Sequence, residues 1–246
     1  MAGNKPIALI GGGTGMVGQR FISLLENHPW FELVAVAASP RSAGKTYEEA
    51  VGGRWKMKTP MPEAAKKLVV LNVNQVEEVA AQVDFVFSAV DMSKDEIRAI
   101  EEAYAKAEVP VVSNNSAHRW TPDVPMMVPE LNPEHAEIIP YQRKRLGTKR
   151  GFIAVKPNCS IQSYTPALHA LREFEPTLVV ATTYQAISGA GKTFKDWPEM
   201  IDNVIPYIAG EEEKSEQEPL RIWGKIEDGV IKKAEGPLIT TQCIRV

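Results

Sequence analysis

A glycine-rich turn near the N-terminus constrains the fold more than any other feature of this chain. In IALIGGGTGMVGQRF, an apolar run at 7–10 leads directly into glycines, and apolar residues then recur at helical spacing. Glycines at a strand-to-helix step allow a tight turn, and the free N–H groups of the helix N-terminus attract a pyrophosphate. In this context the motif predicts a dinucleotide-binding βαβ unit, the alternative being a turn that only packs closely. The residues expected at the cofactor are Gly12, Gly13, Thr14, Gly15, Met16 and Val17.

The end of the second expected strand, 33–38, indicates which dinucleotide is bound. An NAD site usually carries an acidic residue here, which holds the ribose 2′-hydroxyl. In AVAASPRSAGK that place is taken by Ser39, Arg41 and Ser42. Hydroxyls and a guanidinium suit a 2′-phosphate, so the sequence favours NADP. The alternative is a surface loop with an incidental arginine.

Strand-like and helical patterns alternate along the first 150 residues. Further strands are expected at 69–73, 85–89 and 109–113, and a helical stripe, 97–107, separates the last two. This alternation predicts an α/β fold with a parallel, Rossmann-type doubly wound sheet. The pattern changes near residue 150, with a soft boundary within 130–152. We therefore expect two domains, 1–150 for the dinucleotide and 151–246 as a second, α+β domain.

Composition restricts the class of protein. The chain has 246 residues, 44% of them hydrophobic, and a net charge of −3, which argues against a general nucleic-acid or anionic-membrane surface. No apolar run has the length of a signal peptide or a membrane span. Two cysteines far apart in sequence suggest reduced thiols, so we expect a cytoplasmic protein. No CxxC, HxxxH or HExxH spacing occurs, and no metal site is predicted.

Cys159, in AVKPNCS, is the candidate nucleophile. The thiolate is the reactive form, and a helix N-terminus or a nearby cation favours it. A helix is expected just after Cys159, and Lys156 precedes it; alternatively Thr165 and Pro166 open that helix and leave the cysteine in the loop before it. The commoner fate of a free cysteine is a small buried residue, which is what we expect of Cys243 in the apolar strand LITTQCIRV.

A nicotinamide site and an activated cysteine together suggest one chemistry. The thiolate adds to an aldehyde, hydride passes to NADP⁺, and phosphate, CoA or water attacks the resulting thioester.

Six segments of the chain occur in an order that resembles a known family, namely GGTGMVGQRF, SPRSAGK, SNNSAHR, PNCS, QAISGAGK and CIRV. They make the chain similar to aspartate-semialdehyde dehydrogenases of the archaeal and fungal-like branch. The resemblance covers essentially the whole chain. It implies NADP-dependent, phosphorylating interconversion of L-aspartate 4-semialdehyde and L-4-aspartyl phosphate, in the biosynthesis of lysine (through diaminopimelate), methionine, threonine and isoleucine. It also implies a catalytic and dimerisation role for 151–246, and homodimers or homotetramers.

The resemblance also implies site residues. Cys159 matches the family nucleophile, and Gln185 matches a glutamine that positions the acyl intermediate; its alternative is a strand residue facing solvent. Ser88, Ala89, Ser188 and Gly189 match cofactor contacts. The substrate and its phosphate are expected at Asn115, Arg119, Glu218, Arg221 and Arg245.

These substrate residues have individual roles in the family. Asn115 and Arg119 match the phosphate-binding group, or else are a turn asparagine and a surface ion-pair residue. Glu218 matches the carboxylate for the substrate amino group, and Arg221 stands where the family has a phosphate-facing lysine; a surface ion pair between them is the alternative. Arg245 matches the arginine for the substrate carboxylate.

The family's general acid/base is a histidine a few residues beyond the arginine of CIRV, whereas this sequence stops at Val246. We therefore expect a truncated chain that binds NADPH but has little or no turnover. Among the histidines, His118 is expected to shape the phosphate site, and His28, His135 and His169 to lie at surface or helix positions.

Three other functions remain open at this stage. A malonyl-CoA reductase-like acyl-CoA reductase would use the same cysteine on a thioester, and dependence on CoA instead of phosphate would identify it. An N-acetyl-glutamyl-phosphate reductase matches less of the chain. A catalytically impaired NADP-binding fragment or module would lack a selectively reactive Cys159.

Overall fold

The chain folds into two compact units in a computed structural model that describes residues 5–246. The first unit comprises the chain up to Val124 together with Ile139–Val155. The second comprises Pro125–Ile138 and Lys156–Val246.

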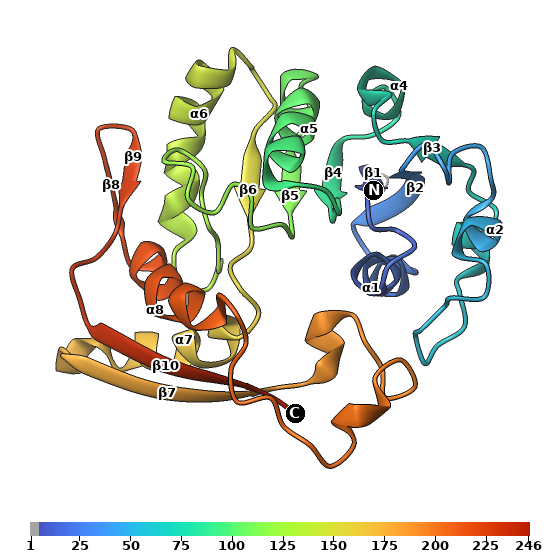
Figure 1. The fold of residues 1–246 in the computed structure, drawn as a ribbon. Helices are drawn as coiled ribbons and strands as arrows, with labels where there is room; N and C mark the ends of the chain where they lie inside the picture. The colour runs from blue at the N-terminus through green and yellow to red at the C-terminus, as the bar shows by residue number, and fades with distance from the viewer. Residues whose placement is uncertain (1–4) are drawn as a thin grey trace. The chain divides into compact units, whose positions relative to one another are not determined.

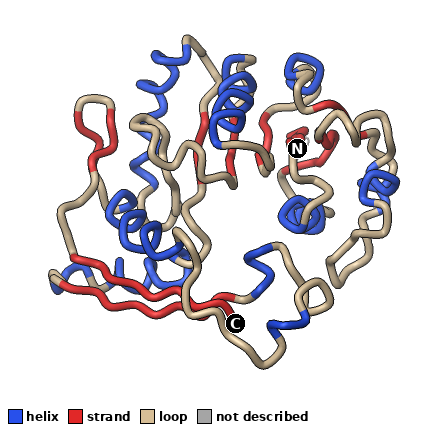
Figure 2. The backbone as a smooth tube through the Cα atoms, viewed as in Figure 1, coloured by secondary structure: helices blue, strands red, loops and turns tan. Residues whose placement is uncertain are grey.

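A six-stranded parallel sheet forms the first unit, in the order β3-β2-β1-β4-β5-β6. Each pairing in it is parallel, and the order reverses between β1 and β4, as in doubly wound dinucleotide-binding sheets. Figure 2 shows the strands in red and the helices in blue. The predicted Rossmann-type architecture is therefore confirmed. The strands are β1 (Lys5–Ile10), β2 (Phe31–Ala38), β3 (Val70–Asn72), β4 (Phe85–Ser88), β5 (Val111–Ser113) and β6 (Ile153–Val155).

Helices connect these strands, as the sequence pattern predicts (Figure 1). The longest, α5 (Lys94–Lys106), begins with a capping box between Ser93 and Glu96, and buries Ile97 and Tyr104 from the expected stripe. The others are α1 (Met16–Leu25), α2 (Tyr47–Val51), α3 (Glu63–Lys66), α4 (Val76–Ala80) and α6 (Ile139–Leu146).

Apolar packing holds α1 and α2 against the sheet. Ile22 of α1 and Tyr47 of α2 are buried beside Val36 and Val70. Burial of such side chains contributes roughly 1.5–3 kcal/mol each, so this cluster stabilises the helix that carries the glycine turn.

The strand β6 corrects the expected domain division. A single boundary at 150 places 153–155 in the second domain, but β6 pairs with β5 as the last strand of the first sheet. Gly151 explains the fit: a Cβ there would overlap the carbonyl oxygen of Ala105, so only glycine lets the chain cross α5 this closely. Conversely, 125–138 groups with the second unit. The division is thus interleaved, because contacts between distant segments decide it.

The second unit is built around two long parallel strands, β7 (Leu178–Gln185) and β10 (Leu238–Arg245), which run side by side in Figure 1. β10 matches the strand expected at LITTQCIRV. The remaining elements are η1 (Pro133–Ile138), α7 (Ile161–Ala170), η2 (Arg172–Phe174), η3 (Ile187–Ala190), η4 (Pro198–Met200), α8 (Glu211–Ile222) and the hairpin β8 (Lys225–Glu227) with β9 (Val230–Lys232).

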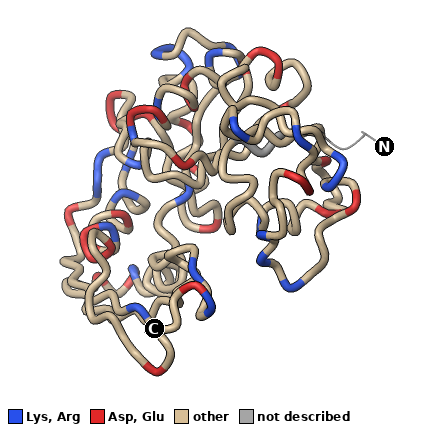
Figure 3. Tube along the Cα trace, turned by 45° about the vertical axis from the view of Figure 1, so that its right-hand side comes forward, with Lys and Arg blue, Asp and Glu red and all other residues tan. Residues whose placement is uncertain are grey.

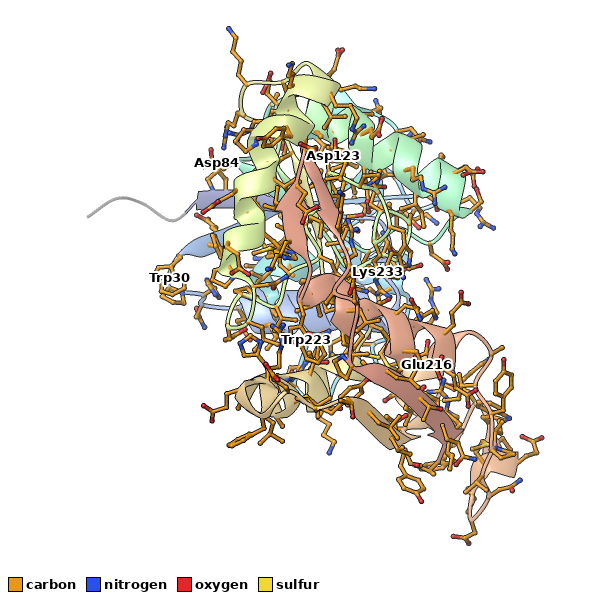
Figure 4. The ribbon with its side chains drawn as sticks, turned by 90° about the vertical axis from the view of Figure 1, so that its left-hand side faces the viewer. Trp30, Asp84, Asp123, Glu216, Trp223 and Lys233 are labelled. Carbon is orange, nitrogen blue, oxygen red and sulfur yellow. The ribbon has the colours of Figure 1, made fainter. Side chains whose placement is uncertain are left out.

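Carboxylates of α8 hold the free edge of β10. The Thr241 N–H donates to Glu216 Oε1 at 3.1 Å, and the Cys243 N–H donates to Glu212 Oε1 at 3.3 Å (Figure 4 labels Glu216). Cys243 is fully buried, as expected. These backbone N–H groups on the edge of β10 thus have side-chain acceptors, and no further strand pairs with that edge among the described residues.

Two other surface properties bear on function. Basic and acidic residues are interspersed along both units in Figure 3. Within 5–246, none of the helices combines the length and apolarity that crossing a membrane requires.

The expected surface or helix position of His135 is only half right. His135 lies in η1 but is 1% exposed, and its ring nitrogens contact Asn132 Nδ2 at 3.1 Å and the Gly224 carbonyl at 3.0 Å. It ties η1 to the end of α8.

Candidate active site

The predicted cofactor residues Gly12 to Val17 form the turn from β1 into α1. Gly12 has a φ of 57°, a left-handed conformation that favours glycine, and a Cβ on it would overlap the carbonyl oxygen of Ala89. Gly15 caps α1, and a Cβ on Gly18 would overlap the Gly12 carbonyl. The structure therefore brings Ala89 and the turn together. The turn leads into the N-terminus of α1, where free N–H groups and the helix dipole favour an anion such as a pyrophosphate.

Two side chains that the sequence analysis missed fix this turn. The Tyr47 hydroxyl donates to the Gly13 carbonyl at 2.5 Å, and burial raises the pKa of Tyr47. Gln19 Nε2 donates to the Thr14 carbonyl at 2.9 Å, and Gln19 Oε1 accepts from the Lys56 N–H at 2.7 Å. No local motif signals the contacts of Tyr47 and Lys56, because these two residues lie well beyond the turn in sequence.

The loop expected to read the 2′-phosphate follows β2 directly. The Ser42 N–H donates to the Ser39 carbonyl at 2.9 Å, which closes a turn, and Arg41 is exposed. The Gly11 N–H donates to the Ala37 carbonyl at 2.6 Å, so the end of β2 lies beside the glycine turn. Hydroxyls and a guanidinium thus stand where an acidic residue would select NAD.

Ser88 and Asn115 meet at a buried carboxylate, Glu101 of α5. Glu101 Oε1 accepts from Ser88 Oγ at 2.6 Å, Ser113 Oγ at 2.6 Å and Asn115 Nδ2 at 3.0 Å. Ser88 and Glu101 are both 0% exposed. The Ser88 hydroxyl is therefore occupied inside the unit, and Asn115 is more than a turn residue. We call these four residues the Glu101 hub.

Arg119 and His118 follow the hub and are both buried, at 6% and 1% exposure. The burial of Arg119 rules out the alternative of a surface ion-pair residue. His118 Nδ1 lies 3.0 Å from Thr121 Oγ1. Burial lowers the pKa of His118 and outweighs the raising effect of the Glu101 carboxylate.

In the second unit, Cys159 is exposed in the loop between β6 and α7. The helix begins at Ile161 with Ser160 as its N-cap, and Pro166 lies inside it. The alternative start at Thr165 and Pro166 is therefore wrong, and the thiol lies one residue before the helix cap, where the helix dipole favours an anion.

Asn158 anchors the loop that carries the thiol. Its Oδ1 accepts from the Ser160 N–H at 2.8 Å, its Nδ2 donates to Glu211 Oε2 at 2.9 Å, and its backbone N–H donates to Glu218 Oε2 at 2.5 Å. The loop is thus bound to α8 through two carboxylates, so the position of Cys159 depends on that helix.

Four of the other predicted residues line one cleft with Cys159. The cleft has a volume of about 790 Å³. Arg245 reaches it from the end of β10, and its Nη1 donates to the Ala186 carbonyl at 2.8 Å. Gln185 ends β7 and is half-buried, and its Nε2 donates to Thr183 Oγ1 at 3.2 Å. The predicted residues in the cleft are Cys159, Gln185, Ser188, Gly189 and Arg245.

Glu218 and Arg221 lie on α8 but do not line this cleft. They are 1% and 3% exposed, so the alternative of a surface ion pair is wrong. Arg221 Nη1 donates to the Ile231 carbonyl at 3.2 Å, and Glu218 accepts from the Asn158 N–H. Both side chains have structural contacts, and their expected substrate roles stay predictions.

Another pair on α8, Glu211 and Lys214, was missed. Lys214 Nζ lies 2.7 Å from Glu211 Oε1, and Glu211 also holds Asn158 beside the thiol. Burial raises the pKa of Glu211, but hydrogen bonds from Lys214 and Asn158 outweigh it and leave that pKa below its ordinary value. The signal was the Glu-x-x-Lys spacing at the start of the GEEEK run, which places both side chains on one helix face.

Two family models match the chain in order. The model described as "Semialdehyde dehydrogenase, NAD binding domain" matches residues 6–139, and "Semialdehyde dehydrogenase, dimerisation domain" matches residues 167–246. The first covers the glycine turn and the Glu101 hub, and the second covers β7, α8 and β10.

Curated relatives agree with these models. The aspartate-semialdehyde dehydrogenase of Aspergillus fumigatus is 41% identical over 96% of this chain and 64% of its own length. That of Saccharomyces cerevisiae is 42% identical over 100% of this chain and 68% of its own length. The solved structure of the Candida albicans aspartate-semialdehyde dehydrogenase with NADP is 37% identical, with a TM-score of 0.85 over 99% of this chain and 68% of that one.

The chain thus spans roughly two thirds of the length of its relatives, 64% for the Aspergillus protein and 65% for that of Methanothermobacter thermautotrophicus. Within that span the fold and both domain models agree. The chain belongs to the aspartate-semialdehyde dehydrogenase family.

Proposed function

We propose that the chain serves an NADP-dependent, phosphorylating dehydrogenase that interconverts L-aspartate 4-semialdehyde and L-4-aspartyl phosphate. The observation that carries this proposal is the cleft in which Cys159, Gln185 and Arg245 lie together. A nucleophile, an oxyanion donor and a cation for a carboxylate are the groups that acyl transfer from a small amino acid requires.

The thiol chemistry follows from these positions. The Cys159 thiolate attacks the aldehyde carbon, and the amide of Gln185 donates to the oxygen that gains negative charge. Bound NADP⁺ supplies the hydride acceptor. Loss of hydride from the carbon leaves a thioester on Cys159. A phosphate oxygen then attacks the thioester carbonyl, and the thiolate leaves as the acyl phosphate forms.

Three charged groups fit the substrate. Arg245 suits its carboxylate, since a guanidinium binds a carboxylate through two parallel hydrogen bonds. Glu211 suits its ammonium group, and Lys214 suits a phosphoryl oxygen. The pair is preferred to Glu218 and Arg221 because its side chains are less buried. Arg119 is proposed as a further phosphate ligand.

The cofactor is proposed to be NADP. Support comes from the glycine turn, from Ser39, Arg41 and Ser42 after β2, and from the Candida albicans relative, whose structure holds NADP. The Tyr47 and Gln19 contacts hold the turn in a shape that a pyrophosphate can approach.

Self-association is also proposed, as a homodimer or homotetramer. The second family model is described as a dimerisation domain. One face of β7 and β10 exposes apolar side chains that a partner subunit would cover, namely Leu178, Val180, Tyr184 and Leu238. The proposed biosynthetic setting is the supply of lysine, threonine, methionine and isoleucine.

A single-turnover experiment tests the proposed reaction. The chain is mixed with aspartate semialdehyde and NADP⁺ without phosphate, and absorbance of NADPH at 340 nm is followed with intact mass. The proposal expects NADPH and an acyl adduct on Cys159 that phosphate, but not CoA, removes; Cys159→Ser is the control. Release by CoA alone would favour an acyl-CoA reductase, and an unmodified thiol with bound nucleotide would favour the catalytically impaired NADP-binding fragment over an active dehydrogenase.

A further inference from the structure

The Glu101 hub fixes which way the Asn115 amide points. Glu101 Oε1 already accepts from the hydroxyls of Ser88 and Ser113, so the group of Asn115 that faces it is the NH₂, which donates, and not the carbonyl oxygen. That NH₂ also faces Ser88 Oγ, at 3.2 Å, and the Asn115 N–H donates to Ser113 Oγ at 3.0 Å. Both amide hydrogens are therefore occupied. The carbonyl oxygen, Oδ1, points away from the hub and has no hydrogen-bond partner within residues 5–246.

The hub lies in the half of the sheet that receives the nicotinamide nucleoside. In a 3-2-1-4-5-6 sheet the dinucleotide crosses the point of reversal at the carboxyl ends of the strands, with one nucleotide on each half. The loop after β2 is on the adenosine side. Ser88 ends β4, and Asn115 follows β5, so both stand on the other side.

We propose that Asn115 Oδ1 accepts a hydrogen bond from the nicotinamide nucleoside half of the cofactor, and that Glu101 is the positioning residue that orients it. The inference rests on the proposed NADP binding. The donors on that half are the carboxamide N–H and the ribose hydroxyls. An acceptor oxygen repels anionic phosphate oxygens, so this role replaces the phosphate contact expected of Asn115, and Arg119 retains that expectation.

The first test compares two ligands on Asn115→Ala. NADPH has the nicotinamide half, whereas adenosine 2′,5′-bisphosphate lacks it. One lost neutral hydrogen bond predicts roughly two- to tenfold weaker NADPH binding and unchanged binding of the bisphosphate. Asn114→Ala is the matched control, expected to bind both as the unaltered chain does. Unchanged NADPH binding by Asn115→Ala, or equal weakening of both ligands, would overturn the proposal.

A third ligand distinguishes the donors. The 3-acetylpyridine analogue of NADPH lacks the carboxamide N–H. If the carboxamide is the donor, Asn115→Ala weakens NADPH but not the analogue; if a ribose hydroxyl is the donor, it weakens both equally. Weaker binding of inorganic phosphate with unchanged NADPH would restore the phosphate role and reject the proposal.

Glu101 variants test positioning. Glu101→Gln keeps an acceptor oxygen at the position of Oε1. Its NH₂ takes the position of Oε2, which has no hydrogen-bond partner in the described chain. The affinity for NADPH should therefore be retained. Glu101→Ala frees the Asn115 amide and should reproduce the loss seen with Asn115→Ala, with no further loss in the double variant. Additive losses, or equal losses for Gln and Ala, would reject positioning. If the unaltered chain binds neither NADPH nor the bisphosphate, the proposal that NADP is the cofactor is rejected.

Discussion

Gly189 packs closely against the guanidinium of Arg245. A Cβ on Gly189 would come within 2.7 Å of Arg245 Nη1, the atom that donates to the Ala186 carbonyl. The turn after β7 and the end of β10 are thus fitted to each other at the point where the proposed substrate carboxylate binds.

Gly189→Ala should therefore displace Arg245 without unfolding the chain. The side chain is flexible, so we expect a loss of about 1 kcal/mol or less in unfolding free energy and roughly tenfold weaker use of aspartate semialdehyde in the single-turnover assay. Ala190→Ser on the same turn is the control. Normal substrate dependence in Gly189→Ala would show that the position of Arg245 does not matter.

Asn158→Ala should loosen the loop that carries Cys159. It removes the acceptor of the Ser160 N–H and the donor to Glu211, both buried or half-buried groups. Leaving them unpaired costs about 1–3 kcal/mol in unfolding free energy. We also expect slower alkylation of Cys159 by iodoacetamide at neutral pH, because the thiol is no longer held at the helix cap. Stability equal to that of the unaltered chain would contradict this account of the loop.

The Glu108 carboxylate should make stability depend on pH in a defined window. The N–H groups of Arg150, Lys149 and Gly151 hold its pKa down to about 2, from an ordinary value of 4.5. Because the folded pKa is lowered, the stabilisation is present above about pH 4.5 and is lost as pH falls toward 2. The difference in unfolding free energy between the unaltered chain and Glu108→Gln should shrink across that window in urea titrations. A constant difference would refute it.

The parts of the fold that the sequence predicted are those with local signals. The strand at 33–38 is a continuous apolar run, and Gly12 is required by its own backbone conformation, so both are visible without partners. The helix just after Cys159 was predicted in the same way, and the role of that thiol as the nucleophile stays a prediction.

What the sequence did not reveal depends on contacts between distant segments. In the sequence Tyr47 has no feature that sets it apart from other buried aromatic residues, and only the structure shows that its hydroxyl donates to the Gly13 carbonyl. Glu101 falls within a helical pattern, and only the approach of β4 and β5 gives it Ser88 and Ser113 as donors. β6 is a run of three apolar residues, and its sequence does not indicate to which domain it belongs.

Gly151→Ala gives the sharpest test of why β6 joins the first sheet. A Cβ there would overlap the backbone carbonyl of Ala105, which cannot move without shifting α5, so β6 must withdraw. We expect a loss of about 3 kcal/mol or more in unfolding free energy. The matched control is Gly147→Ala, where φ is 74° and nothing lies within 4 Å, so only the backbone conformation costs, about 1–2 kcal/mol. Urea titration of both variants makes the comparison. Equal losses would mean that the approach to Ala105 does not hold β6 in place.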